Sequence, residues 1–110
     1  MYLPKADVYD SLKALPYFVS QTQPAIFNDL PAIIFSVGNN GVSVDLDGDI
    51  ASQDVEIKID IWAEDSVTAS TVLSQVEEIM RSNFYIMSFS NDVPNVSNLY
   101  HIVNRFAKQI

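Results

Sequence analysis

The sequence predicts an α+β fold with a largely antiparallel sheet, an N-terminal helix and one main helix packed on one face of that sheet. Three patterns support this class. The first is a strict alternation of β-branched residues over Val55–Ile61, which is typical of a half-buried strand. The second is the helical spacing of apolar residues between Val67 and Met80. The third is a series of short apolar segments that are joined by polar or proline-containing links. These links are so short that the chain can contain only a few helices.

The composition places the chain among single globular domains with a packed interior. Its 110 residues are 48% apolar and 18% charged, which is enough apolar material for one core. There is no cysteine, so disulfides and thiolate chemistry are excluded, and the composition fits a reducing compartment. We therefore expect one domain that spans residues 1–110.

The charge balance argues against binding to nucleic acid. The net charge is −8, from 14 acidic and 6 basic residues, whereas binding to a phosphate backbone requires lysine and arginine. Plain solubility and repulsion of nucleic acid both account for this acidity. The longest apolar stretch, Pro31–Phe35, is too short to span a bilayer, and no apolar run follows a basic start. We expect a soluble protein that does not bind membranes.

The first half of the chain predicts one helix and a hairpin. Helical spacing favours a helix that begins at Pro4 and ends before Pro16. The segment Gly38–Gly41 reads Gly-Asn-Asn-Gly, and both residue types tolerate positive φ, so it predicts a tight turn. The other expected segments are a short strand at Tyr17–Val19, a strand at Ala32–Val37, a returning strand at Val42–Leu46 and a loop at Gly48–Gln53.

The second half holds the clearest elements. The strand Val55–Trp62 should direct its four β-branched residues to one face and Glu56, Lys58, Asp60 and Trp62 to the other. Asp65 or Ser66 can cap the next helix, and Asn83, which accepts the left-handed conformation, should close it. The remaining segments are expected to be a strand at Phe84–Phe89, a connection at Asn91–Asn98 and a last strand at Leu99–Phe106.

Aromatic residues fall on both faces of the predicted late strands. One helix covers only one face of a sheet, so the second face must be covered by the N-terminal helix or by a partner subunit. If a partner covers it, Trp62, Tyr85 and Phe89 are the candidate subunit-interface aromatics.

Acidic residues cluster before the long strand. Counted from Asp45, carboxylates occupy calcium-loop positions 1, 3 and 5, and Glu56 falls at position 12. However, Ile50 stands where such a loop requires glycine, and both flanks are predicted strands rather than helices. A solvated acidic turn is the favoured interpretation over a cation site. As a functional hypothesis, this turn contacts a partner or lines a channel through the four aspartates Asp45, Asp47, Asp49 and Asp54.

No residue pattern indicates catalysis. His101 is the only histidine, and without cysteine or a second histidine it lacks companions for a metal site. Glu77 and Glu78 should face solvent on the main helix. The sequence contains no nucleophile-elbow motif and no glycine-rich phosphate loop. We therefore predict no enzymatic activity, no metal and no cofactor.

The order of elements and certain residues resemble the tail terminator proteins of long-tailed bacteriophages, also called tail completion or tail-to-head joining proteins. The likeness covers nearly the whole chain as a pattern of hydrophobic spacing. It rests on Val8–Lys13 in the opening helix, Pro31–Phe35 as the first long strand, the acidic loop, Val55–Ala63 ending in an aspartate–aliphatic–aromatic step, the helix to Met80, the Phe84 that follows it, and the late Tyr100, His101 and Arg105.

The resemblance implies a structural role in the virion. Such proteins form a homo-oligomeric ring, commonly a hexamer, that caps the tail tube and docks to the head–tail connector protein. DNA passes through the ring without specific binding. The resemblance would place the chain at the tail–head junction of the virion and, during assembly, in the cytoplasm of the bacterial host. It supplies no catalytic residues.

Three other functions compete with this one. Another small phage protein, for head completion or a minor tail component, has a similar size. A small-molecule-binding regulatory domain of the ferredoxin-like type is possible, although no glycine-bearing ligand loop is evident. An acidic mimic of nucleic acid would need its carboxylates along one stripe, whereas the sequence distributes them between loop, strand and helix.

Overall fold

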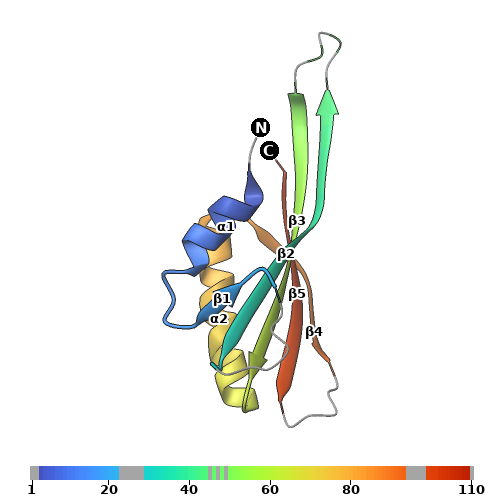
Figure 1. Cartoon of the computed structure of the whole chain (residues 1–110). Coiled ribbons are helices and arrows are strands. Elements are labelled where there is room, and N and C mark those ends of the chain that lie inside the picture. The colour runs from blue at the N-terminus through green and yellow to red at the C-terminus, as the bar shows by residue number, and fades with distance from the viewer. Residues whose placement is uncertain are drawn as a thin grey trace.

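The computed structural model describes residues 3–22, 29–44, 46, 48, 50–93 and 99–109. It contains two helices and a five-stranded sheet (Figure 1). The elements in chain order are α1 Pro4–Leu12, β1 Phe18–Ser20, β2 Ala32–Val44, β3 Ile50–Ala63, α2 Ser66–Ser82, β4 Ile86–Val93 and β5 Tyr100–Gln109.

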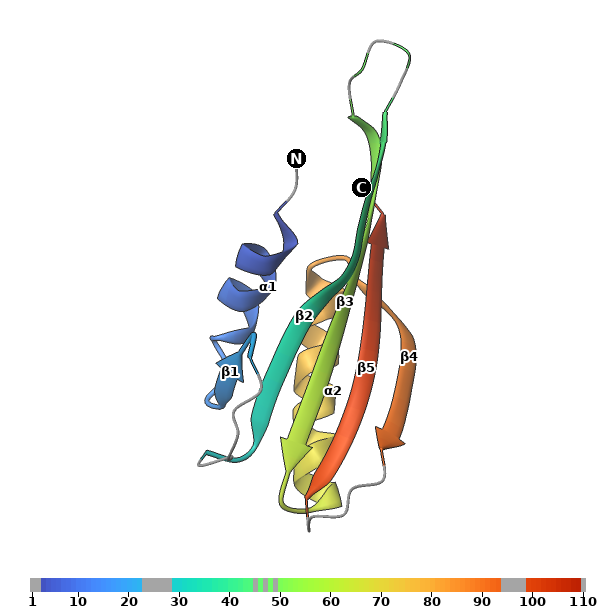
Figure 2. The ribbon, with the colours of Figure 1, turned by 45° about the vertical axis from the view of Figure 1, so that its right-hand side comes forward.

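The sheet is mixed, with strand order β1-β2-β3-β5-β4. Only the short β1–β2 pairing is parallel, and the other three pairings are antiparallel. Both helices lie on the same side of the sheet, and Figure 2 shows α2 behind the central strands and α1 beside it. The predicted α+β class, with a largely antiparallel sheet and its helices on one face, is confirmed.

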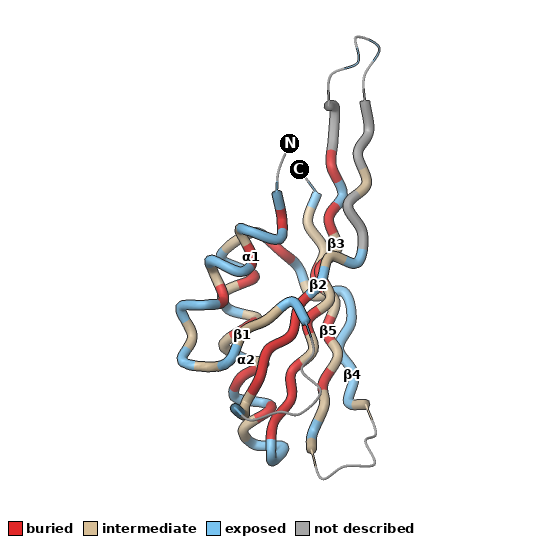
Figure 3. The backbone as a smooth tube through the Cα atoms, in the orientation of Figure 1, coloured by how far each residue is buried: buried red, intermediate tan, exposed pale blue. Residues whose placement is uncertain are grey.

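The core lies between the sheet and the two helices. Ile57, Ile59 and Ile61 are completely buried, as the strict alternation in the sequence predicts. They pack in one cluster with apolar side chains of α1 and α2, and the buried positions follow the middle of the strands in Figure 3. The helical members of this cluster are Val8, Leu12, Ala69, Val72, Val76 and Met80.

The boundaries of both helices follow from local hydrogen bonding. α1 begins at Pro4 as predicted and ends at Leu12, with Lys13 as its C-cap. Beyond the cap the chain turns, and the Leu15 N–H bonds to the Leu12 carbonyl three residues earlier. Asp65 caps α2, as predicted, by accepting a hydrogen bond of 2.7 Å from the Thr68 backbone N–H. Val67, expected in the apolar stripe of α2, is instead 75% exposed at its first turn.

The left-handed residue that closes α2 is Phe84, not Asn83. Asn83 has φ −97°, whereas Phe84 has φ 68°. The Phe84 N–H bonds to the Arg81 carbonyl and the Tyr85 N–H to the Met80 carbonyl, which is the pair of bonds of a Schellman motif. The motif requires positive φ at this position, and glycine usually supplies it. Asn83 is the C-cap of α2, as predicted, but the expectation that it takes the left-handed conformation was wrong.

The predicted turn at Gly38–Gly41 was also wrong. β2 runs straight through it, and its pairing with β3 extends from Ala32↔Trp62 to Val44↔Ile50. Gly38 is instead the extra residue of an irregularity between Val37 and Asn39. A Cβ at Gly38 would lie 3.1 Å from Glu56 Oε1, so glycine leaves room for that carboxylate. The reversal comes later in the chain, where Gly48 has φ 85°.

The late strands are longer and shifted along the chain. β4 occupies Ile86–Val93, two residues later than the predicted start, because Phe84 and Tyr85 complete the helix cap. β5 continues past Phe106 to Gln109 and pairs with β3 as far as Asp54. The predicted connection therefore loses its first residues, Asn91–Val93, to β4.

β2 and β3 together form an arm that projects from the body. We define the arm as Val42–Val44 of β2 with Ile50–Gln53 of β3, the part that lies beyond the end of β5. Figure 1 shows it extending past both helices and both chain ends. The molecule measures 54 × 26 × 25 Å, and its radius of gyration of 15.1 Å exceeds the value of about 13 Å expected for a compact domain of this length.

Candidate functional site

One face of the sheet carries none of the described helices. We call it the helix-free face and define it by Ile34, Asp60, Trp62, His101 and Arg105. The register places Trp62 beside Ala32 and His101, and Asp60 beside Ile34 and Val103. Since directly paired residues of neighbouring strands share a face, these side chains form continuous rows across the sheet.

Trp62, His101 and Asp60 form the tightest polar cluster on this face. The Trp62 and His101 rings are stacked, with centroids 3.9 Å apart and an angle of 10° between their planes. His101 Nε2 lies 2.8 Å from Asp60 Oδ1, and both side chains are only 14% exposed. The cluster fixes the imidazole between an indole ring and a carboxylate.

Two ion pairs occupy the rest of the face. Arg105 Nη1 lies 2.7 Å from Glu56 Oε1, with side chains 42% and 35% exposed. Lys58 Nζ lies 3.8 Å from Asp60 Oδ2. Such partly exposed pairs contribute little to stability, but they neutralise most of the charge on this face. Charges that are already paired within the chain are poor ligands for a phosphate or a metal ion.

The three candidate interface aromatics lie in different environments. Trp62 is 9% exposed and packs on the helix-free face with Ala32 and Ile34, against Leu30 and Leu99. Phe89 lies on the edge strand β4 and is 46% exposed. Tyr85 is 2% exposed and belongs to the core between sheet and helices. Tyr85 therefore presents no surface to a second subunit, because the helix cap turns it inward instead of into a strand.

The acidic turn is described only in part. Asp45, Asp47 and Asp49 lie outside the described residues. Asp54 lies at the base of the arm, where it pairs with Gln109, and its side chain is exposed. Glu56, at position 12 of the hypothetical calcium loop, is bound to Arg105.

No group of three or more histidine, cysteine, aspartate or glutamate side chains could hold a metal ion in the described part of the chain. His101 and Asp60 resemble a base with its orienting carboxylate, but no interaction in the described structure joins a hydroxyl to the imidazole. Glu77 is paired with Arg81 along α2. None of the described helices is long and apolar enough to cross a membrane.

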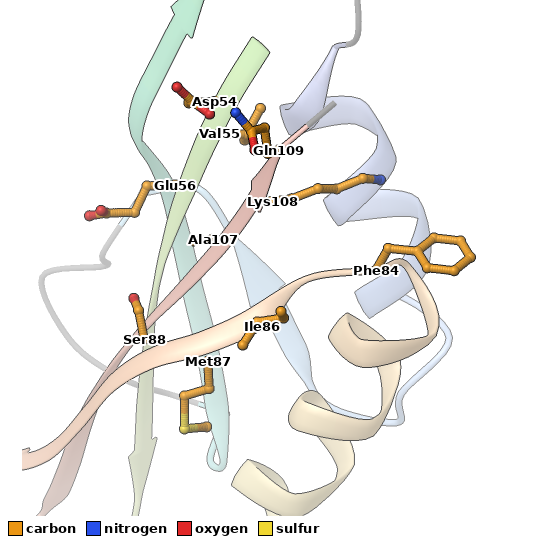
Figure 4. A pocket seen from close by; sticks show the side chains of 10 residues that line it. All are labelled: Asp54, Val55, Glu56, Phe84, Ile86, Met87, Ser88, Ala107, Lys108 and Gln109. Carbon is orange, nitrogen blue, oxygen red and sulfur yellow. The ribbon is translucent and has the colours of Figure 1, made fainter. Parts of the chain in front are cut away.

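A shallow cleft of about 680 Å³ lies where α2 passes into β4 (Figure 4). Its apolar walls include Phe84 and Ile86, which are 80% and 74% exposed. The Lys108 ammonium lies 5.9 Å from the centroid of the Phe84 ring and 5.2 Å from that of Tyr85. Sequence reasoning placed both apolar residues inside a strand and so missed their exposure. Their arrangement suits contact with another protein better than capture of a small ligand.

The arm is the second candidate surface, because no described strand pairs with the outer edge of either of its two strands. β1 pairs with β2 only at Ala32–Ile34, so no described strand covers the outer edge of Gly38–Val44. β5 pairs with β3 only from Asp54 onward, so no described strand covers the outer edge of Ile50–Ser52. Leu46, beyond the arm, is fully exposed.

No protein-family model matches the sequence, and no curated protein resembles it closely enough to indicate a relative.

Proposed function

We propose that this chain is a structural protein of virion assembly that forms a ring, caps the tail tube of a long-tailed phage and joins it to the head connector without catalysis. The observation that carries the proposal is the arm, a two-stranded ribbon outside the two-layered body of sheet and helices. An isolated two-stranded ribbon is at best marginally stable in water. An arm of this kind is therefore best explained as a contact element that completes its packing against another protein.

The helix-free face supports the same role. It carries the half-exposed Phe89 on β4, the strand whose first residue, the exposed Ile86, lines the cleft together with the exposed Phe84. Exposed apolar residues gathered on one side of a small protein are typical of an interaction surface. Within a ring, such a surface makes a heterologous contact when it meets a second, different surface of the neighbouring subunit.

The charge distribution suits a channel for DNA. Between Val42 and Ile57 the sequence carries five carboxylates and no basic residue. A wall that carries this charge repels the phosphate backbone, so DNA passes without being retained.

The competing functions receive less support. The element order αβββαββ differs from the βαββαβ order of ferredoxin-like domains, which disfavours the regulatory-domain reading. An acidic nucleic-acid mimic needs free carboxylates in one stripe. Here the carboxylates lie on two different elements, Glu56 and Asp60 on β3 and Glu77 on α2. Each of them is paired with a basic side chain.

Size-exclusion chromatography with light scattering, over a range of protein and salt concentrations, tests the proposal. We expect a closed oligomer of defined mass. The resemblance implies that this oligomer is a hexamer. A strict monomer under every condition would contradict ring formation, and a ligand-induced rise in melting temperature would favour the regulatory domain instead.

The acidic turn supplies a second test of the same function. Replacing Asp45, Asp47, Asp49 and Asp54 by asparagine or serine should leave the circular dichroism and melting temperature unchanged but reduce the yield of joined heads and tails in the phage that carries the variant gene. Normal yields of infectious particles would remove the proposed role of this turn.

A further inference from the structure

We propose that the arms of neighbouring copies pair edge to edge, with the outer edge of β2 in one copy bound antiparallel to the outer edge of β3 in the next. The occupant of each edge is thus a second copy of this chain. The inference rests on the proposed ring, and it specifies which surface closes it.

The first argument is the absence of protection on these edges. Natural sheets guard free edges with lysine, proline or other charges, because an unpaired row of N–H and C=O groups binds further strands. Neither Gly38–Val44 nor Ile50–Ser52 contains a charged residue or a proline. The irregularities at Gly38 and near Ala51 lie in the pairing between β2 and β3. The sequence therefore leaves both outer edges open to another strand.

The second argument is the direction of the strands. β2 and β3 run antiparallel to each other within the arm. When two arms stand side by side and point the same way, the β2 edge of one faces the β3 edge of the other, and these strands again run antiparallel. Pairing of this kind uses two different edges, so it is heterologous, and it forms a ring when the rotation between neighbouring copies closes.

The third argument is that closure pairs the edges of both arm strands at once. In a closed ring of arms each β2 edge at Val42–Val44 meets a β3 edge at Ile50–Ser52, as in a barrel. A two-fold contact between two β3 edges would leave both β2 edges open. The structure therefore favours the ring over the two-fold dimer.

The charges near the arm set the dependence on salt. The sequence between Val44 and Ile50 carries three aspartates, so neighbouring copies whose arms point the same way bring like charges toward one another. Salt screens repulsion between exposed charges. High salt should therefore stabilise the oligomer, so that it dissociates only at lower protein concentration. Replacing the aspartates of this segment by asparagine should weaken this salt dependence.

Hydrogen exchange tests the pairing without assuming a register. Amides within Val42–Val44 and Ile50–Ser52 should exchange at least tenfold more slowly in the oligomer than in the dilute monomer. Ser43→Lys and Ser52→Lys, which each place a charge on one edge, should each reduce assembly. Ser70→Lys, on the exposed side of α2, adds the same charge as a control and should leave assembly unchanged.

Disulfide cross-linking identifies which edges meet. The chain has no cysteine, so Ser43→Cys, Ser52→Cys and Ala51→Cys can be made as single-cysteine chains that form no internal disulfide. After mixing and oxidation, the predominant product should join Ser43→Cys to one of the β3 variants. Predominant β3-to-β3 products would overturn the arrangement in favour of a two-fold contact.

The outcomes separate this inference from the proposed function. An oligomer whose arm amides remain unprotected, or which gives no cross-link between arms, would overturn arm pairing and leave ring formation intact. Arm pairing in an open filament would support the edge contact and contradict the closed ring. A strict monomer would contradict both.

Discussion

The indole of Trp62 and the imidazole of His101 lie face to face across β3 and β5, 3.9 Å apart. Asp60 lies two residues before Trp62 on the same face, and its Oδ1 is hydrogen-bonded to Nε2 of the imidazole at 2.8 Å. This arrangement gives the lone histidine a structural role. It stiffens the helix-free face where the described structure provides no helix to cover it.

We predict that His101→Ala destabilises the fold by about 1–2 kcal/mol, because both the ring stack and the hydrogen bond to Asp60 are lost. Trp62 is the only tryptophan, so its fluorescence during urea unfolding measures the change directly. His101→Phe keeps the stack and should lose less. Equal stability of His101→Ala and the wild type would show that the stack contributes nothing.

Ile59 provides the test of the core face. Its side chain is fully buried at the centre of β3, so Ile59→Asp would bury an unpaired carboxylate. We expect a loss of about 4 kcal/mol or more in the free energy of unfolding, which is a large part of the stability of a small domain. Ser36→Asp, on the exposed side of β2 beside Lys58, is the matched control and should be tolerated. A soluble Ile59→Asp variant of unchanged stability would reverse the assigned faces.

Ile59 also shows why part of the fold is predictable. Alternation depends only on the pleat of a strand that is buried on one side, so the faces of β3 follow directly from its sequence. The hairpin does not, because Gly38–Gly41 suits a turn and also suits an irregular strand. Pairing with β3 decided between these two conformations, and that contact is not local. The end of α2 was missed for a similar reason, since Phe84 tolerates positive φ only because the helix cap imposes it.

The candidate surfaces were predictable to a lesser degree. Trp62 could be placed opposite the isoleucine face from alternation alone, but its stack on His101 depends on the register between β3 and β5. The free edges of the arm depend on where β1 and β5 end. These are properties of strand neighbours, and one sequence does not reveal them.

Phe84 gives a prediction of increased stability. A side chain other than glycine at φ 68° costs roughly 1 kcal/mol, and the Phe84 ring is 80% exposed, so it recovers little by packing. Phe84→Gly should therefore raise the free energy of unfolding by about 0.5–1 kcal/mol, measured by urea denaturation. Phe84→Ala removes the same ring and its contact with Lys108 but keeps the Cβ, so it should give no gain. If both variants behaved alike, backbone strain would not be the cause.

The cap of α2 gives a prediction about pH. The backbone N–H of Thr68, followed by its side-chain hydroxyl, holds the pKa of Asp65 below its ordinary value. A carboxylate whose pKa is lowered by folding stabilises the protein above the pKa of the unfolded chain, and this contribution disappears as pH falls through the folded pKa. Asp65→Ala should therefore lower the melting temperature at pH 7.

The difference between Asp65→Ala and the wild type should then shrink as the pH falls below about 4, where the wild-type carboxyl becomes protonated. Asp65→Asn is the control, since its amide oxygen still accepts the Thr68 N–H bond while its charge is absent at every pH. It should retain most of the melting temperature at pH 7. A gap between Asp65→Ala and wild type that stays constant down to about pH 2, roughly two pH units below the ordinary aspartate pKa, would mean that the cap acts through packing and not through the ionised carboxylate.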